Sequence, residues 1–161
     1  MRKILILLTF VLIGAGVWAC GDKLMLVMRF RPSPVKPAAI LGYTRVDSPS
    51  SKLMRELQLH PAVRKAGHRF EFVDDLAKLD GALKTGKYDL VLADMGIAGE
   101  VSQRVSSAPS RPVVLPVAYN AAKADQSAAQ KTYHSLLKLP GGPDHYLDAI
   151  DQAMDWKAKR R

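Results

Sequence analysis

The chain is short of cysteine, of acidic residues and of aromatic residues. One of its 161 residues is cysteine, which excludes an internal disulfide bond and any metal site built from several cysteines. Only 15 Asp and Glu stand against 24 Lys and Arg, and the resulting net charge of +9 favours an acidic partner. Aromatic residues make up 7%, without aromatic–basic interleaving or a nucleic-acid motif, so nucleic acid is not an expected partner.

The motifs of common enzymes and metal sites are also absent from the sequence. It has no phosphate-binding P-loop, no Gly-x-Gly-x-x-Gly and no Gly-x-Ser-x-Gly elbow. The four histidines are scattered without metal-ligand spacing, at His60, His68, His134 and His145. We therefore predict no catalytic residues, no metal and no cofactor, and keep a small envelope enzyme with an unrecognised site only as a third hypothesis.

Residues 1–20 read as a secretory signal peptide. Two basic residues open the segment, an uncharged apolar run follows, and Val17 and Ala19 have the −3 and −1 spacing of a cleavage site before Cys20. This pattern predicts an exported protein, periplasmic or associated with the cell envelope.

Two other fates of this segment stay open. Cys20 could become lipidated, because Val17-Trp18-Ala19-Cys20 resembles a lipoprotein signal, although Trp18 stands where a small residue is usual. Alternatively, the run could remain as an anchor. It is short for a membrane span, and the basic residues after it could hold the domain in the cytoplasm.

The remaining chain divides into a basic arm, one domain and a basic tail. Residues 21–37 form the arm, which has three prolines in its last seven positions and therefore reads as extended. Residues 38–156 form the domain, and residues 157–161 are assigned to a solvated tail. The basic residues of the arm and the tail could contact an anionic membrane surface.

Apolar runs alternate with helical patterns along residues 38–156. We expect five strands, at 38–43, 68–73, 88–93, 112–117 and 135–139. Helices are expected between them and at 144–159, because leucines and alanines recur there at helical spacing. Near-continuous apolar strands joined by helices predict an α/β fold with a parallel sheet covered on both faces.

Several residues mark where helices start and stop. Ser48 is a candidate N-cap with Pro49 in the first turn, and Pro61 should interrupt or restart that helix. Asp74 or Asp75 should cap the next helix, and these adjacent side chains point apart, which argues against an acid–base pair.

The second half of the domain resembles response-regulator receiver domains, the CheY-like family. Residues 87–99 (KYDLVLADMGIAG) are similar to the family's central strand and the loop that carries a phospho-accepting aspartate, here Asp94. Residues 112–115 are similar to its fourth strand, and residues 136–150 to its Lys-Pro turn and final helix. The resemblance implies a flavodoxin-like, doubly wound sheet of order 2-1-3-4-5, with ligands at the carboxyl ends of the strands.

The chain departs from the family where phosphotransfer needs its ligands. The resemblance implies an acidic pair that holds Mg²⁺ after the first strand, but this chain has Gly42 and Tyr43 there. The hydroxyl position after the fourth strand holds Val117 or Ala118. Lys138 is separated from Pro140 by Leu139, whereas the family has the lysine and proline adjacent. We therefore favour a structural Asp94, paired with Lys138 or capping the following loop.

These observations lead to two main functional hypotheses. In the first, the chain is an exported, non-catalytic receiver-like domain that binds an envelope protein or a small ligand. It would use the last helices and edge strand or the carboxyl edge of the sheet, where Tyr43 and Tyr119 could line a small pocket beside Asp94. In the second, the domain stays in the cytoplasm on an anchor and accepts a phosphoryl group on Asp94, with Mg²⁺ and Lys138 as partners.

Overall fold

The structure is a computed structural model that describes residues 36–160, apart from the side chains of residues 58 and 59. The signal peptide, Cys20 and nearly all of the arm lie outside the described residues, as does the last residue of the tail. Within the described part of the chain no helix is long and apolar enough to span a membrane.

Five parallel strands form one sheet, in the order β2-β1-β3-β4-β5. The strands are β1 (Ala39–Tyr43), β2 (Arg69–Val73), β3 (Leu90–Asp94), β4 (Val113–Tyr119) and β5 (Leu137–Leu139). The helices are α1 (Ser51–Leu59), α2 (Pro61–Lys65), α3 (Leu76–Lys84), α4 (Ala98–Ser106), α5 (Lys123–Tyr133) and α6 (Pro143–Lys159). The predicted fold class and strand order are therefore confirmed.

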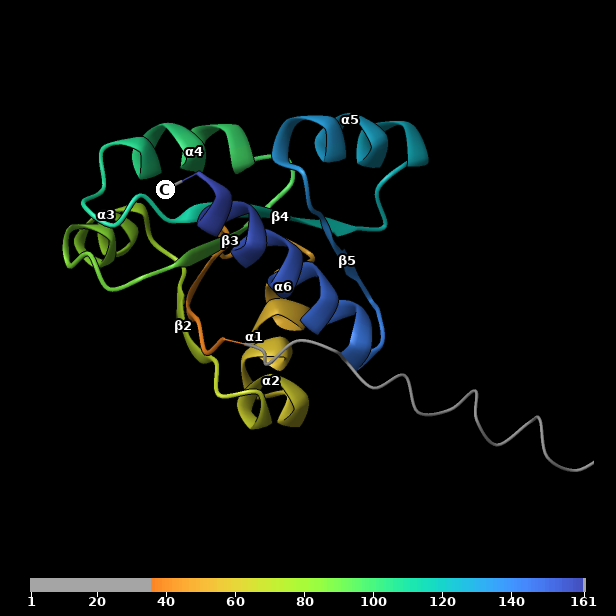
Figure 1. The fold of residues 1–161 in the computed structure, drawn as a ribbon. Coiled ribbons are helices and arrows are strands. Elements are labelled where there is room, and N and C mark those ends of the chain that lie inside the picture. Colours follow the sequence, from red (N-terminus) through yellow and green to blue (C-terminus); the bar gives the residue numbers. More distant parts are fainter. Residues whose placement is uncertain (1–35, 161) are drawn as a thin grey trace, which may run out of the picture. The chain divides into compact units, whose positions relative to one another are not determined.

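Helices cover both faces of the sheet, as Figure 1 shows. On one face α1, α2 and α6 pack on a core cluster that includes Leu90, Leu92 and Leu137. On the other face α3 and α4 pack on a second cluster that includes Val91 and Ala93, while α5 lies over Ala118 of β4. Alternate residues of each strand thus serve opposite cores, which explains why the central strands are apolar throughout.

The helix boundaries follow local signals except at α1. Pro61 starts α2, and Asp75 caps α3 by accepting the backbone N–H groups of Ala77 and Lys78. Helix α1 begins at Ser51 rather than at Pro49, and Ser50 occupies the N-cap position without making a side-chain cap bond. The predicted cap, Ser48, donates its hydroxyl to Asp94 instead.

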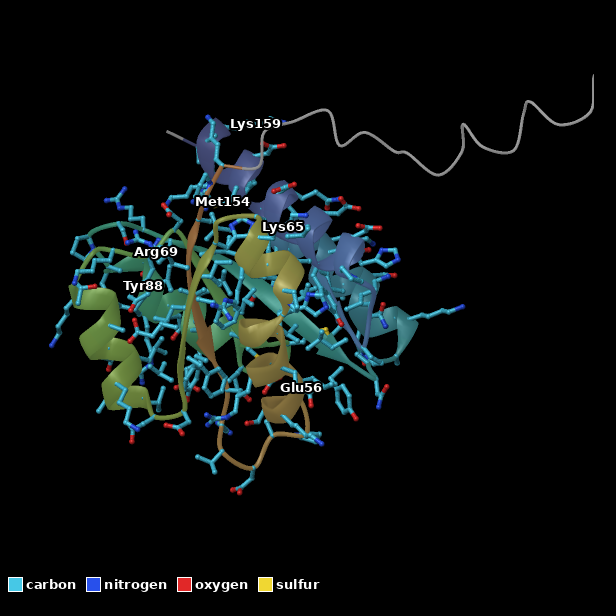
Figure 2. The ribbon with its side chains drawn as sticks, turned by 90° about the horizontal axis from the view of Figure 1, so that it is seen from below. Glu56, Lys65, Arg69, Tyr88, Met154 and Lys159 are labelled. Carbon is cyan, nitrogen blue, oxygen red and sulfur yellow. The ribbon has the colours of Figure 1, made fainter. Side chains whose placement is uncertain are left out.

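The C-terminal helix ends at Lys159, as predicted, but its last turn is not solvated throughout. Lys157, which we assigned to a solvated tail, lies inside α6 and is only 7% exposed. Its Nζ donates to Oδ1 of Asp89 at 2.7 Å, and Asp89 also accepts the backbone N–H of Ala39 at the amino edge of β1. Lys159, half a turn later, is exposed at the end of the helix (Figure 2). The solvated tail therefore begins beyond Lys157.

Candidate functional site

Asp94 is the last residue of β3, at the carboxyl edge of the sheet. The loop that follows β1 passes beside it, because β1 and β3 are paired neighbours and β1 ends at Tyr43. This edge is where doubly wound folds place their ligands. The prediction that Asp94 stands at the carboxyl end of the third strand is confirmed.

Three hydroxyl groups from the β1–α1 loop donate to the Asp94 carboxylate. Thr44 Oγ1 and Ser48 Oγ each donate to Oδ2 at 2.5 Å, and Ser50 Oγ donates to Oδ1. Thr44 is 0% exposed and Ser50 is 1% exposed, so both hydroxyls are shielded from water. We call Asp94, Thr44, Ser48 and Ser50 the Asp94 hydroxyl cluster.

This cluster suits a structural acid better than a nucleophile. An ionised carboxylate is an acceptor at both oxygens, and three hydroxyl donors match that capacity while holding the loop onto β3. Oδ2 accepts two of these donors, so a phosphoryl group arriving there would have to displace one of them, and at Oδ1 it would compete with Ser50. We predicted that Asp94 pairs with Lys138 or caps the following loop, but its side chain instead accepts hydrogen bonds from the β1–α1 loop.

The donor set around Asp94 does not fit Mg²⁺. Magnesium favours octahedral oxygen coordination with carboxylates and waters, whereas here the neighbours of the single carboxylate are neutral hydroxyls that donate to it. Asp47, the one acid of the β1–α1 loop, is exposed. Among residues 36–160, no group of three or more His, Cys, Asp or Glu could hold a metal ion.

Lys138 lies on the opposite face of the sheet from Asp94. Asp94 has the same strand parity as Leu90 and Leu92, which belong to the core under α1, α2 and α6. In β5, Leu137 and Leu139 belong to that same core, so Lys138 between them faces the other way and is exposed. Within the described part of the chain, Asp94 and Lys138 form no ion pair.

The residue before Pro140 is Leu139, which is buried at 4% exposure. The lysine is therefore one position too early to reach the carboxyl edge on the side of Asp94. A one-residue offset in a strand moves a side chain to the other face, and this is the physical reason that the predicted pairing fails.

Tyr43 and Tyr119 do not share a pocket. Tyr43 is buried in the core under α3 and α4, whereas Tyr119 packs against the core on the other face. Burial, followed by the nearby Glu100 carboxylate, raises the pKa of Tyr43. The family's hydroxyl position is also apolar here, since Val117 and Ala118 are buried at 1% and 2% exposure within β4.

A charged network borders the carboxyl edge on the α3–α4 side. Arg104 of α4 contacts Asp80 of α3 at 2.7 Å and Glu100 at 3.4 Å, and Arg45 reaches Glu100 at 3.4 Å. These pairs are partly exposed, so water screens them and they contribute little to stability. The network was not predicted, because apart from the i,i+4 pair Glu100–Arg104 its members are far apart in sequence.

Comparisons with known proteins support the fold and nothing finer. No protein-family model matches the chain, and no curated protein matches it. A CheY-like response regulator receiver domain protein from Methanospirillum hungatei JF-1 is similar in structure, with 14% identity, a TM-score of 0.51, and 75% of this chain and 98% of that chain covered. The chemotaxis protein CheY4 of Vibrio cholerae has 16% identity and a TM-score of 0.48, with 73% and 99% covered.

Proposed function

We propose that this chain is a non-catalytic receiver-like domain that binds a protein or a small ligand in the cell envelope. The fold is that of CheY-like receiver domains. In this proposal Asp94 is a structural residue, the chain needs no Mg²⁺, and the domain acts by binding alone.

The Asp94 hydroxyl cluster is the observation that carries the proposal. Phosphotransfer to aspartate needs a free carboxylate oxygen, a divalent cation and a nearby ammonium group. Both oxygens of Asp94 instead accept hydroxyl groups, the donor set is wrong for magnesium, and Lys138 faces away. The first two requirements fail at the Asp94 hydroxyl cluster, and the third fails at β5.

Export is supported by residues 1–20 of the sequence. A basic start, an apolar run and a cleavage-type spacing before Cys20 are typical of a secretory signal. The signal-like segment and the Asp94 hydroxyl cluster support the same proposal. An exported domain would be separated from ATP-dependent kinases and would have no use for a phospho-accepting site.

A phosphorylation assay tests the non-catalytic part of the proposal. The full chain is incubated with acetyl phosphate and Mg²⁺, and its intact mass is measured beside that of Asp94→Asn. We expect no gain of a phosphoryl group in either protein. A gain in the unaltered chain that is lost in Asp94→Asn would establish the alternative, a phospho-accepting receiver with Asp94 as acceptor.

The location is tested separately by cell fractionation and mass analysis of the mature N-terminus. We expect a chain that begins at Cys20 or Gly21 in the envelope fraction, and a lipid mass on Cys20 would identify the lipidated form. An intact N-terminus on a cytoplasmic domain would contradict the export proposal and favour the anchored form.

A further inference from the structure

A groove lies at the amino edge of the sheet, at the opposite end of β4 from Asp94. It has a volume of about 1110 Å³, and it is lined by α4 and the turn after it, the start of β4, the end of α5 and the end of α6. Figure 1 shows the C-terminal end of α6 near α4, where these elements meet. The groove shares no residue with the Asp94 hydroxyl cluster.

The groove is basic. Its lining holds Arg111, Lys157 and Arg160 and not one acidic residue. Asp89 neutralises Lys157 at 2.7 Å, whereas Arg111 and Arg160 form no ion pair within the described part of the chain. Arg160 follows α6 directly, where a cation favours the helix dipole, but Arg111 lies five residues beyond the end of α4 and has no such explanation.

An aromatic wall lies next to the two arginines. The rings of His134 and Trp156 are stacked with their centroids 3.7 Å apart and their planes at 19°. The Arg160 guanidinium lies 5.9 Å from the Trp156 ring centroid. Flat rings beside guanidinium groups offer both apolar contact and carboxylate recognition in one place.

Two residues that line the groove have a left-handed backbone conformation. Arg111 has φ of 41° and His134 has φ of 65°, in the left-handed region that favours glycine and asparagine. Both side chains line the groove. His134 is the C-cap of α5, where helices commonly end in this conformation, whereas Arg111 is a non-glycine residue held in it outside a helix end.

We infer that this groove binds an extended acidic peptide segment of a partner protein, and this inference rests on the proposed binding function. Charge complementarity favours an anionic occupant, since the lining has two unpaired arginines and no acid. The volume of about 1110 Å³ is at the upper end for small-molecule pockets and leaves room for several side chains of a peptide. The concave shape of the groove and its aromatic rings fit an extended peptide better than a flat lipid surface.

The probe is a fluorescein-labelled octapeptide of alternating Glu and Leu, titrated with the full chain and followed by fluorescence anisotropy. A second peptide has Gln in place of each Glu. We expect saturable binding of the Glu peptide, at least tenfold weaker binding of the Gln peptide, and slowed hydrogen–deuterium exchange in residues 106–114 and 132–135. Absence of saturation up to ~1 mM of chain would overturn the inference.

Matched variants test the location. The pair Arg111→Asn and Arg160→Gln removes both groove cations, and asparagine tolerates the left-handed conformation, so the fold should persist. The pair Arg64→Gln and Arg69→Gln removes two exposed cations elsewhere. We expect roughly tenfold weaker peptide binding for the groove pair and less than about twofold for the control pair.

Other results would overturn the inference in distinguishable ways. Equal losses in both pairs would mean that overall charge attracts the peptide. Groove-dependent binding to vesicles containing phosphatidylglycerol, without peptide binding, would identify a membrane contact instead. Loss of the peptide site would leave the proposed function standing, because that function fails only if Asp94 gains a phosphoryl group or the domain proves to be cytoplasmic.

Discussion

Replacing Asp94 with alanine is expected to destabilise the domain strongly. The substitution removes the acceptor that Thr44, Ser48 and Ser50 share, and thus the link between the β1–α1 loop and β3. In a site built for phosphotransfer, the same change would affect chemistry first and stability little.

The magnitude follows from burial. A hydrogen bond to a charged group contributes ~1.5–3 kcal/mol, and a buried hydroxyl left without a partner costs ~1–3 kcal/mol. Thr44 and Ser50 are 0% and 1% exposed, so water reaches them only through the half-buried position of Asp94. The carbonyl of Arg45, 3.3 Å from Thr44 Oγ1, and the contact between Ser48 Oγ and Ser50 Oγ at 3.0 Å offset part of the loss. Such contributions are not additive, and we expect a loss of about 3–5 kcal/mol for Asp94→Ala. Asp94→Asn keeps one acceptor oxygen and should lose about half of that.

The assay is urea unfolding followed by circular dichroism, which gives the free energy of unfolding. Asp47→Ala is the matched control, because Asp47 is an exposed acid in the same loop, and it should change stability by less than ~0.5 kcal/mol. In a Thr44→Val, Ser50→Ala background the buried hydroxyls are gone, so Asp94→Ala should cost less than in the unaltered chain.

A cost below ~0.5 kcal/mol for Asp94→Ala would refute the structural role of the carboxylate. A gain in stability would refute it more strongly, because acids kept at the expense of stability are characteristic of working sites. Either result would favour the alternative hypothesis, in which Asp94 is a phospho-acceptor.

Three further predictions concern the core. Asp89→Ala should lower the free energy of unfolding by about 3 kcal/mol, because it leaves the buried Lys157 without its ion-pair partner. Lys157→Met should lower it by less than ~1.5 kcal/mol, because the Asp89 side chain is 32% exposed and stays hydrated. Urea unfolding compares the two variants, and equal losses would contradict this difference. Burial, aided by its hydrogen bond to Glu71, raises the pKa of Tyr88 to about 12. The neutral phenol therefore stabilises the fold fully below pH ~10, and this stabilisation is lost as the pH rises toward 12. The free energy of unfolding measured across that range should decline in the unaltered chain and not in Tyr88→Phe. Gly42→Ala should lose ~1–3 kcal/mol by thermal unfolding because its Cβ would lie 2.8 Å from Phe70 Cε1, and an unchanged melting temperature would show that the ring moves at no cost.

The strands could be predicted because their signals are local. Residues 88–93 and 112–117 are apolar at nearly every position, as strands buried on both faces must be, and they became β3 and β4. Lys157 could not be predicted, because its burial depends on Asp89, which is 68 residues away. A lysine in the last turns of a helix reads as solvated unless that partner is known.

The candidate site was predicted in part. Asp94 was recognised from the strand that it ends, but its partners were not. Ser48 was interpreted as a helix cap because a serine before Pro49 usually serves that role, and the competing bond to Asp94 is a tertiary one. The prediction put Lys138 on the same face of the sheet as Asp94, which is wrong. Strand β5 has only three residues, and an error of one position in the alternation moves a side chain to the other face.

The two edges of the sheet suggest where binding should be sought. Doubly wound folds bind ligands at the carboxyl ends of their strands, and there this chain engages its central acid with its own hydroxyl groups. Residues 36–160 hold 18 basic and 14 acidic side chains, a net charge of +4 that attracts an acidic partner only weakly from a distance. Arg111 and Arg160 nevertheless meet in a groove without acids at the amino edge. A local excess of charge in a weakly charged domain favours recognition of a defined segment over general attraction, so removing the two groove arginines should weaken binding more than removing two cations elsewhere.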